Sequence, residues 1–181
     1  MDACKMQYAV HNGTYVLKLR GDVRVPLCTS LEGFVEDHLL NDAGLRAVLI
    51  DLTETEAIDS TALGLLARIA VALQTRKLGK PVILCINPDI ERILVSMGFD
   101  QVFRILQTTA ALRDKLAELP VECLSEDEVT QSVIDAHRTL MSLNENNQVS
   151  FRSLVDALEN EQRQRHRYSS RLSGWPDAGR N

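Results

Sequence analysis

The chain has 181 residues, of which 45% are hydrophobic and 25% are charged, a composition typical of a globular domain. Its formal net charge of −5 gives the whole molecule no electrostatic reason to bind nucleic acid. No apolar run approaches the roughly 20 residues that span a bilayer, and the first ten residues, MDACKMQYAV, lack the apolar core of a signal peptide, so we expect a cytoplasmic chain without direct membrane insertion.

Strand and helix signals alternate along the first two thirds of the chain. Residues 8–10 and 15–19 are strand-like, and the Asn-Gly pair between them favours a hairpin turn. Residues 28–40 predict a helix that Thr29 or Ser30 can cap. The apolar face of that helix comprises Leu31, Phe34, Val35 and His38/Leu39.

Two buried strands and a helix follow. Residues 47–50 form a continuous apolar run, which predicts a strand covered on both faces, and residues 53–59, TETEAID, are interpreted as a polar connection. Residues 60–79 predict a helix that ends at a glycine, and residues 81–87, PVILCIN, predict a second buried strand. The core stripe of the helix comprises Leu66, Ile69, Ala70 and Leu73.

Three weaker elements complete this part of the chain. Residues 88–99 predict a short helix with a proline in its first turn, residues 101–106 predict a strand, and residues 108–119 predict an amphipathic helix. The order β-β-α-β-α-β-α-β-α predicts an α/β fold, with a mixed sheet of about five strands, mostly parallel after the hairpin and covered by helices. We assign residues 1–119 to this domain.

Only helix signals occur in the last third of the chain. Residues 125–143 begin with a Ser-x-x-Glu capping box, and residues 149–168 carry a second apolar stripe, so the two segments predict a helical hairpin joined by a polar turn at residues 143–148. The stripes comprise Val129, Val133, Ala136/His137, Leu140 and Leu143, and then Phe151, Leu154, Val155 and Leu158. We assign residues 120–168 to a C-terminal helical extension and residues 169–181 to a flexible tail.

Familiar catalytic motifs are absent from the sequence. It contains no GxxxxGK[ST] phosphate loop, no GxGxxG dinucleotide fingerprint and no GxSxG nucleophile turn. The four cysteines are widely spaced, and the four histidines are isolated and lack ligand spacing. We therefore expect no catalytic residue, no cofactor and no metal site, and we interpret His137, on a helix face, as a packing or exposed residue.

A cluster of acids follows the central apolar run: Asp51, Glu54, Glu56 and Asp59. An acid directly after a buried strand is also found in receiver domains, where it accepts a phosphoryl group. That chemistry needs further acids after the first strand, to hold a divalent cation, and a lysine after the last strand. Here the first strand ends in HNG and the last is followed by QTT, so we disfavour that function. We interpret Glu54 and Glu56 as residues of a solvated loop.

The stretch AIDSTALGLLARIA, residues 57–70, places an acid, a serine and a threonine between a strand signal and a helix signal. A serine at the start of a helix signal is typical of an N-cap, and in that role Ser60 would stabilise the helix by about 1 kcal/mol. The sequence shows no evident base partner for Ser60, which argues against a nucleophile that acts by itself.

The order of elements, with IDSTALGLL following RAVLIDL, resembles the STAS domain of anti-anti-sigma factors over about residues 5–118. That family carries D-S-[ST]-G-x-G at the start of the helix after the third strand. The matching residues are Asp59, Ser60 and Thr61, whereas Ala62 replaces the first glycine. A second departure follows the second strand, where the family often has G-x-[apolar]-D and this chain has GDVR.

The resemblance implies an anti-anti-sigma factor that is a phospho-switched regulator and not an enzyme. By that analogy Ser60, with Thr61 as the second choice, is phosphorylated by an anti-sigma factor that is an ATP-dependent serine kinase, and a serine phosphatase removes the phosphate. Only the unphosphorylated form binds the anti-sigma partner. The implied partner-binding surface comprises Asp59, Ser60, Thr61, Leu63, Asp22 and Arg24, and Arg24 stands where the family has an acid.

The sequence leaves open an alternative function and the role of the helical extension. The chain would also suit an accessory STAS subunit of a lipid or anion transport assembly, which would need a separate membrane partner. The helical extension lies outside the common STAS core, and we expect it to add a second docking surface or a dimer contact through its two helices.

Overall fold

A six-stranded sheet forms the centre of the computed structural model, which describes residues 5–108, 116–118 and 125–173. The strand order is β5-β4-β3-β2-β1-β6; β1 pairs antiparallel with β2 and β6, and the other neighbours are parallel. The mixed sheet expected from the sequence is confirmed, with β6 as an additional short edge strand. The strands are β1 (Lys5–His11), β2 (Thr14–Val23), β3 (Ala47–Ile58), β4 (Val82–Leu84), β5 (Arg104–Leu106) and β6 (Ala117–Glu118).

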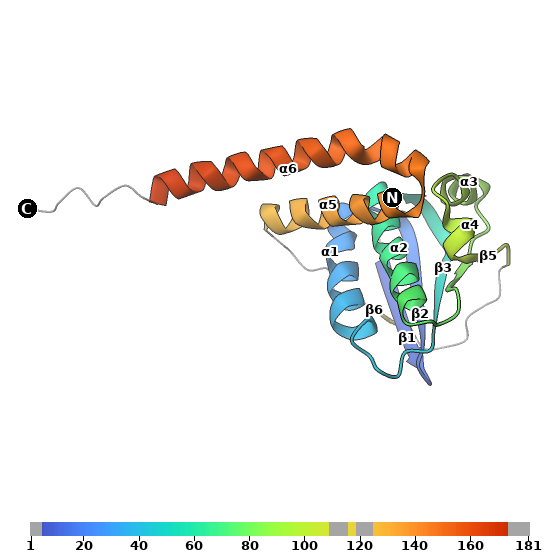
Figure 1. The fold of residues 1–181 in the computed structure, drawn as a ribbon. Helices are drawn as coiled ribbons and strands as arrows, with labels where there is room; N and C mark the ends of the chain where they lie inside the picture. The colour runs from blue at the N-terminus through green and yellow to red at the C-terminus, as the bar shows by residue number, and fades with distance from the viewer. Residues whose placement is uncertain (1–4, 109–115, 119–124, 174–181) are drawn as a thin grey trace, which may run out of the picture.

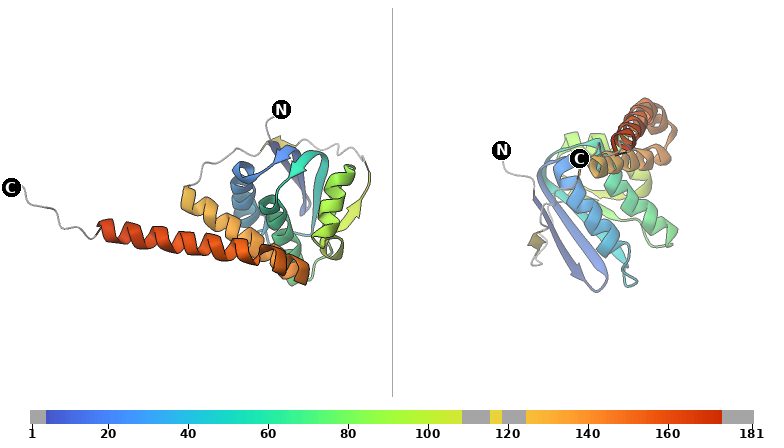
Figure 2. Two further views of the ribbon diagram at one scale, coloured as in Figure 1. Left: turned by 90° about the horizontal axis from the view of Figure 1, so that it is seen from above. Right: turned by 90° about the vertical axis from the view of Figure 1, so that its left-hand side faces the viewer.

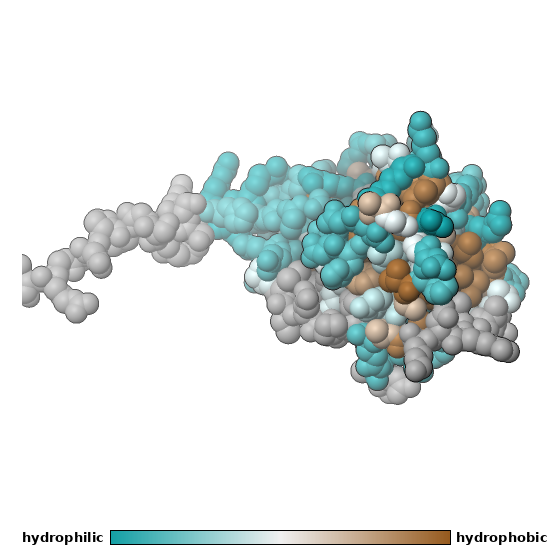
Figure 3. Space-filling view, turned by 90° about the horizontal axis from the view of Figure 1, so that it is seen from below, coloured by the Kyte–Doolittle hydropathy of each residue, from teal (hydrophilic) through white to brown (hydrophobic). Residues whose placement is uncertain are grey.

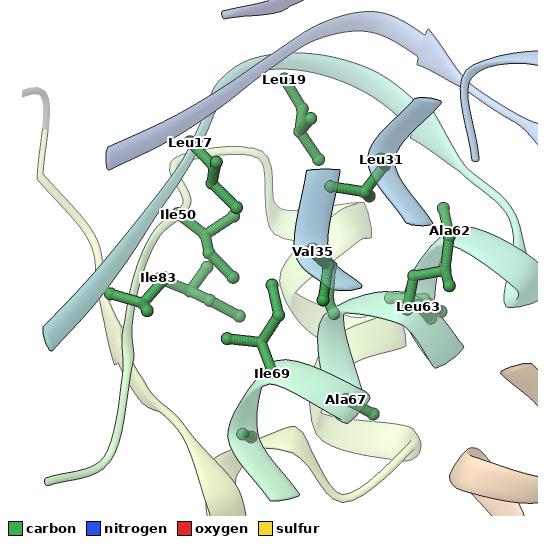
Figure 4. Close-up of a cluster of buried hydrophobic side chains, with 14 of the residues drawn as sticks. Leu17, Leu19, Leu31, Val35, Ile50, Ala62, Leu63, Ala67, Ile69 and Ile83 are labelled. Atoms are coloured by element: carbon green, nitrogen blue, oxygen red, sulfur yellow. The ribbon is translucent and has the colours of Figure 1, made fainter. Parts of the chain in front are cut away.

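Two helices, α1 and α2, lie side by side against one face of this sheet (Figure 1). The helical elements are α1 (Val25–Gly33), the π-helix η1 (Phe34–Leu39), α2 (Ser60–Thr75), α3 (Pro88–Ser96), α4 (Phe99–Val102), α5 (Glu126–Leu143) and α6 (Glu145–Ser173). Figure 4 shows the core between α1, α2 and the sheet, where Leu17 and Leu19 of β2 face Leu31 of α1 and Leu63 of α2. This core includes buried residues of β1, β2, β3 and β4, and Ile105 of β5 packs against it.

The predicted β1–β2 hairpin is confirmed, and its turn requires the two residues that the sequence supplies. Asn12 has a φ of 49° and Gly13 a φ of 79°, the left-handed pair that a tight hairpin turn needs. A Cβ on Gly13 would lie 2.1 Å from the carbonyl oxygen of Gly44, so this position admits only glycine. The turn thereby sets the register in which Lys5 pairs with Arg20.

Helix α2 is buried almost all round, and this explains its unusually apolar sequence. The predicted stripe from Leu66 to Leu73 is buried, but so are most residues from Thr61 to Ala67. A helix packed on one side only would need a single apolar stripe. Here the sheet covers one side of α2, and α5 covers another (Figure 2).

The predicted helical hairpin of the extension is also present. Helix α5 begins with the capping box of Ser125 and Glu128, in which each side chain bonds the backbone of the other residue. Figures 1 and 2 show α5 crossing the ends of α1 and α2 where these helices begin, with α6 lying along α5. Helix α6 continues well past the start of α5, and this overhanging part is hydrophilic (Figure 3). Leu140 of α5 belongs to the same hydrophobic core as the sheet.

Several sequence predictions about element ends are wrong. The strand predicted at residues 101–106 begins only at Arg104, because Phe99–Val102 form helix α4. The first long helix begins at Val25, after Arg24, so Thr29 and Ser30 lie inside α1 and do not cap it. Pro26 falls in the first turn, where a missing N–H costs nothing, and it marks this start better than the hydroxyl residues do. The polar turn assigned to residues 143–148 is also too long, because α6 already begins at Glu145.

The polar connection predicted at residues 53–59 is instead the second half of strand β3. It pairs with β2 as far as Ile58, and Lys18 and Arg20 of β2 match its acids. Lys18 Nζ lies 2.5 Å from a carboxylate oxygen of Glu54, and Arg20 Nε lies 2.6 Å from the other. Glu54 is therefore paired within the sheet, and Glu56 is an exposed strand residue; neither lies in a loop.

The last predicted element of the first domain is only partly visible. A helix is expected over residues 108–119, but residues 117–118 form strand β6, in which Ala117 and Glu118 pair with Tyr8 and Gln7 of β1. Residues 109–115 and 119 of that prediction lie outside the described residues.

Candidate functional site

The site is built where the end of β2 meets the beginning of α2. The backbone N–H of Asp59 donates to the carbonyl oxygen of Val23 at 3.1 Å. One oxygen of the Asp59 carboxylate accepts from the backbone N–H of Ala62 at 2.8 Å, and the other accepts from that of Val25 at 3.1 Å. The two segments that the sequence singled out, GDVR and DST, are therefore held side by side by one aspartate.

Ser60 does not cap α2, contrary to the local interpretation of the sequence. Asp59 is the N-cap, and Ser60 is the first residue of the helix. Because Asp59 already binds the free N–H of Ala62, the Ser60 hydroxyl can bond elsewhere. Ser60 is half-buried, and its Oγ lies 2.8 Å from Nε2 of His137 in α5.

His137 is the base partner that the sequence did not reveal. Its Nδ1 lies 2.7 Å from the carbonyl oxygen of Val133, one turn earlier in α5. A carbonyl only accepts, so Nδ1 carries a proton. Nε2 is then the ring nitrogen that is hydrogen-bonded to the Ser60 hydroxyl. The ring is buried, with 2% of the residue exposed, and packs edge-on against Phe151 of α6 with centroids 5.0 Å apart.

This serine–histidine pair lacks the third member of a catalytic triad. In a triad a carboxylate binds Nδ1 and stabilises the imidazolium that forms during the reaction. Here a neutral carbonyl of the same helix occupies Nδ1. Among the described residues the pair therefore holds a hydroxyl in place, with a carbonyl and not a carboxylate at Nδ1.

A second contact brings α5 against α2 four residues further along. A Cβ on Gly64 would lie 2.3 Å from the carbonyl oxygen of Ala136 and 2.6 Å from its Cα. No side chain fits there, so the two helix backbones touch at this point. The close approach explains why α2 carries a glycine in its interior, at a cost in helix propensity of about 1 kcal/mol.

The other predicted partner-binding residues fall into two groups. Asp22 and Arg24 lie at the surface and form an ion pair of 3.3 Å, with 44% and 64% of their side chains exposed. Thr61 and Leu63 are buried, with 4% and 2% exposed, and Leu63 belongs to the core (Figure 4). The structure thus places Asp22 and Arg24 at the surface, leaves Asp59 and Ser60 half-buried beside them, and buries Thr61 and Leu63.

The described residues contain neither a metal-binding cluster nor a membrane-spanning helix. Within residues 5–108, 116–118 and 125–173 no group of three or more histidine, cysteine, aspartate or glutamate side chains could hold a metal ion. In the same residues no helix is both long and apolar enough to cross a membrane.

Residues 5–112 match the sequence model of the STAS domain family. No curated protein matches the chain by sequence. Among solved structures, a protein of Thermotoga maritima assigned as an anti-sigma factor antagonist is 21% identical, over 58% of this chain and 88% of that one, with a TM-score of 0.51. This likeness, together with the family match, confirms the expected STAS-like fold.

Two further solved structures are similar at lower scores. SpoIIAA, an anti-sigma factor antagonist in its unphosphorylated form, is 15% identical over 59% of this chain and 90% of its own, with a TM-score of 0.48. An anti-sigma factor antagonist from Mycobacterium paratuberculosis is 23% identical over 59% of this chain and 88% of its own, with a TM-score of 0.44. The family match ends at residue 112, so α5 and α6 lie beyond it.

Proposed function

This chain belongs to the STAS domain family, and from that membership we propose that it is an anti-anti-sigma factor that works by partner switching. In this proposal the unphosphorylated chain binds an anti-sigma factor in the cytoplasm, and phosphorylation of Ser60 releases it. The chain itself performs no catalysis. The observation that carries the proposal is the position of the Asp59-Ser60-Thr61 motif at the start of α2, beside the end of β2.

The covalent step is a phosphoryl transfer to the Ser60 hydroxyl. The Oγ attacks the γ-phosphorus of ATP held by a serine kinase, the bond to the bridging β–γ oxygen breaks, ADP leaves, and the hydroxyl proton passes to a base. A serine phosphatase restores the hydroxyl by hydrolysis. Thr61 is the second-choice acceptor, and its burial makes it the harder of the two to reach.

A phosphate on Ser60 changes the surface without requiring the domain to unfold. The first N–H groups of a helix and its dipole favour an anion at that position. The phosphate adds a charge of about −1.5 to −2 at pH 7, next to the carboxylate of Asp59. The surface that Asp22, Arg24, Asp59 and Ser60 form therefore becomes more acidic and costlier to desolvate, which opposes partner binding.

The experiment compares partner binding by substituted chains. Ser60→Ala is expected to bind an anti-sigma serine kinase from the same cells constitutively, and Ser60→Asp is expected to lose binding while it stays folded. Ser96→Asp, at an exposed serine at the end of α3, is the matched control for an added charge. Peptide mass spectrometry of protein from its own cells locates the phosphate.

Equal binding by the Ser60→Ala and Ser60→Asp chains would contradict the proposal. Phosphate found on Thr61 and absent from Ser60 would move the switch to the neighbouring residue. The dimer contact expected of the two C-terminal helices stays a prediction, which sedimentation of the full chain tests.

A further inference from the structure

The C-terminal hairpin lies on the part of α2 that the proposed function needs to expose. His137 of α5 is hydrogen-bonded to the hydroxyl of Ser60, and Ala136 packs its backbone on Gly64, one turn along α2. Leu140, one further turn along α5, is fully buried in the domain core. Two successive turns of α5 are thus docked on the domain, and the first of them lies against the Ser60 hydroxyl.

A phosphoryl group cannot be added to Ser60 in this arrangement without movement of α5. Nε2 of His137 lies at hydrogen-bonding distance, 2.8 Å, from the Ser60 Oγ. The incoming phosphorus must reach bonding distance of the same Oγ, and the kinase cleft must surround it. The backbone contact between Gly64 and Ala136 prevents α5 from yielding by a side-chain rotation alone.

We propose that the hairpin of α5 and α6 is an intramolecular occupant of the partner surface around Ser60, so that the kinase and the anti-sigma factor reach that surface only after α5 lifts from α2. This inference rests on the proposed function for the identity of the competing partners. It gives the chain a third state, unphosphorylated and closed, beside the bound and the phosphorylated states.

The two ends of α5 are held to the domain with different strength. The hydroxyl of Ser132, one turn before Ala136, is buried and has no hydrogen-bond partner among the described residues. A buried polar group without a partner opposes docking. The far end of α5 is held more firmly, because Asn147 donates to the carbonyl oxygens of Met97 and Leu140. Helix α5 can therefore lift at Ser60 while its C-terminal end stays attached.

Three substitutions that leave Ser60 and His137 unchanged test the inference. Gly64→Ala places a methyl group in the backbone of Ala136 and shifts the chain toward the open state, while alanine favours the helix itself. Gly79→Ala is the matched control, since a Cβ there meets nothing within 4 Å. Ser132→Ala removes the unpartnered hydroxyl and shifts the chain toward the closed state.

The first measurement needs no kinase. Hydrogen exchange followed by mass spectrometry on the full chain reports the opening of α5, residues 126–143. Exchange there is expected to be about tenfold faster in Gly64→Ala, unchanged in Gly79→Ala and slower in Ser132→Ala. The circular dichroism of each chain shows that the domain is folded. Equal exchange in Gly64→Ala and Gly79→Ala would overturn the inference.

The second measurement is the fraction of Ser60 that carries phosphate in cells, by peptide mass spectrometry. It is expected to rise several-fold in Gly64→Ala and to fall in Ser132→Ala. A lower phosphorylated fraction in Gly64→Ala would mean that α5 assists the transfer, and it would overturn the inference. Equal phosphorylated fractions in chains whose α5 opens at different rates would overturn it as well. Phosphate absent from Ser60 in every chain would contradict the proposed function instead, and the exchange rates would then decide alone whether α5 closes over Ser60.

Discussion

The carboxylate of Asp59 accepts a hydrogen bond of 3.1 Å from the backbone N–H of Val25, the first residue of a different helix. Its other oxygen accepts from the N–H of Ala62 in α2. One side chain therefore satisfies free N–H groups at the beginnings of both helices on this face of the sheet. The motif aspartate has a structural role that is separate from any part it takes in partner binding.

Replacing Asp59 by alanine is expected to destabilise the fold by about 1–2 kcal/mol, because two helix starts lose an acceptor. The free energy of unfolding in urea measures this loss. Asn87→Ala is the comparison, since Asn87 caps α3 through a single bond to the N–H of Asp89 at 3.0 Å and its loss is expected to cost less. Equal losses in the two chains would show that the bond to Val25 contributes nothing.

A binding test at Asp59 has to allow for this structural role. Asp59→Asn keeps a side-chain oxygen for one of the two N–H groups and removes the charge beside Ser60. A chain with Asp59→Asn that is nearly as stable as the parent but binds its partner differently would isolate the contribution of the charge.

The parallel strands were predicted well because a strand that is buried on both faces has a continuous run of apolar residues. Residues 47–50 and 82–84 are continuous apolar runs, and both are parallel strands. The second half of β3 was missed because its residues are polar. Its Glu54 is paired with Lys18 and Arg20 of β2, and these residues are too far away in the sequence for the pairing to be predicted. Local pattern cannot show which strand a polar segment pairs with.

The candidate site was predicted only in part, because some of its residues are far apart in the sequence. The Asp59-Ser60-Thr61 motif is local and was found. His137 was not, because it reaches Ser60 only when α5, which begins 66 residues after Ser60, folds back on α2. Gly64 carried a usable signal, since a glycine inside a helix usually marks a close approach of another backbone.

The amide of Asn147 is a second anchor whose removal should be costly. The residue is 2% exposed, and its side-chain nitrogen donates to Met97 and Leu140, which joins α6 to α5 and to the turn after α3. Asn147→Ala leaves the Leu140 carbonyl without this donor and is expected to lower the free energy of unfolding by about 2–3 kcal/mol. Equilibrium unfolding in urea measures the change.

The neighbouring residue supplies the control for that anchor. Asn146 is exposed and lies in the same turn of α6, so Asn146→Ala should change stability by less than about 0.5 kcal/mol. If both alanine chains unfold at the same urea concentration, the buried bonds of Asn147 do not hold the hairpin to the domain.

The acid stability of the fold should depend on Glu54. Its hydrogen bond to Lys18 is the main cause that lowers the pKa of Glu54 from its usual 4.5, and Arg20 adds to it. A pKa that is lower in the folded chain than in the unfolded chain means that the ionised carboxylate stabilises the fold. This contribution is complete above pH 4.5 and is lost as the pH falls through and below that value.

Glu54→Gln removes this contribution at neutral pH and makes the remaining stability less sensitive to acid. The loss at pH 7 should be roughly 0.5–1 kcal/mol, because the side chain is 43% exposed and water screens the pair. Urea unfolding at several pH values between about 3 and 7 should show the parent and the Glu54→Gln chain converging at the acid end. Glu56→Gln, at an exposed position two residues along the same strand, should run parallel to the parent over the whole range. A constant difference between the Glu54→Gln chain and the parent from neutral to acid pH would show that the carboxylate charge of Glu54 is not what stabilises the second half of β3.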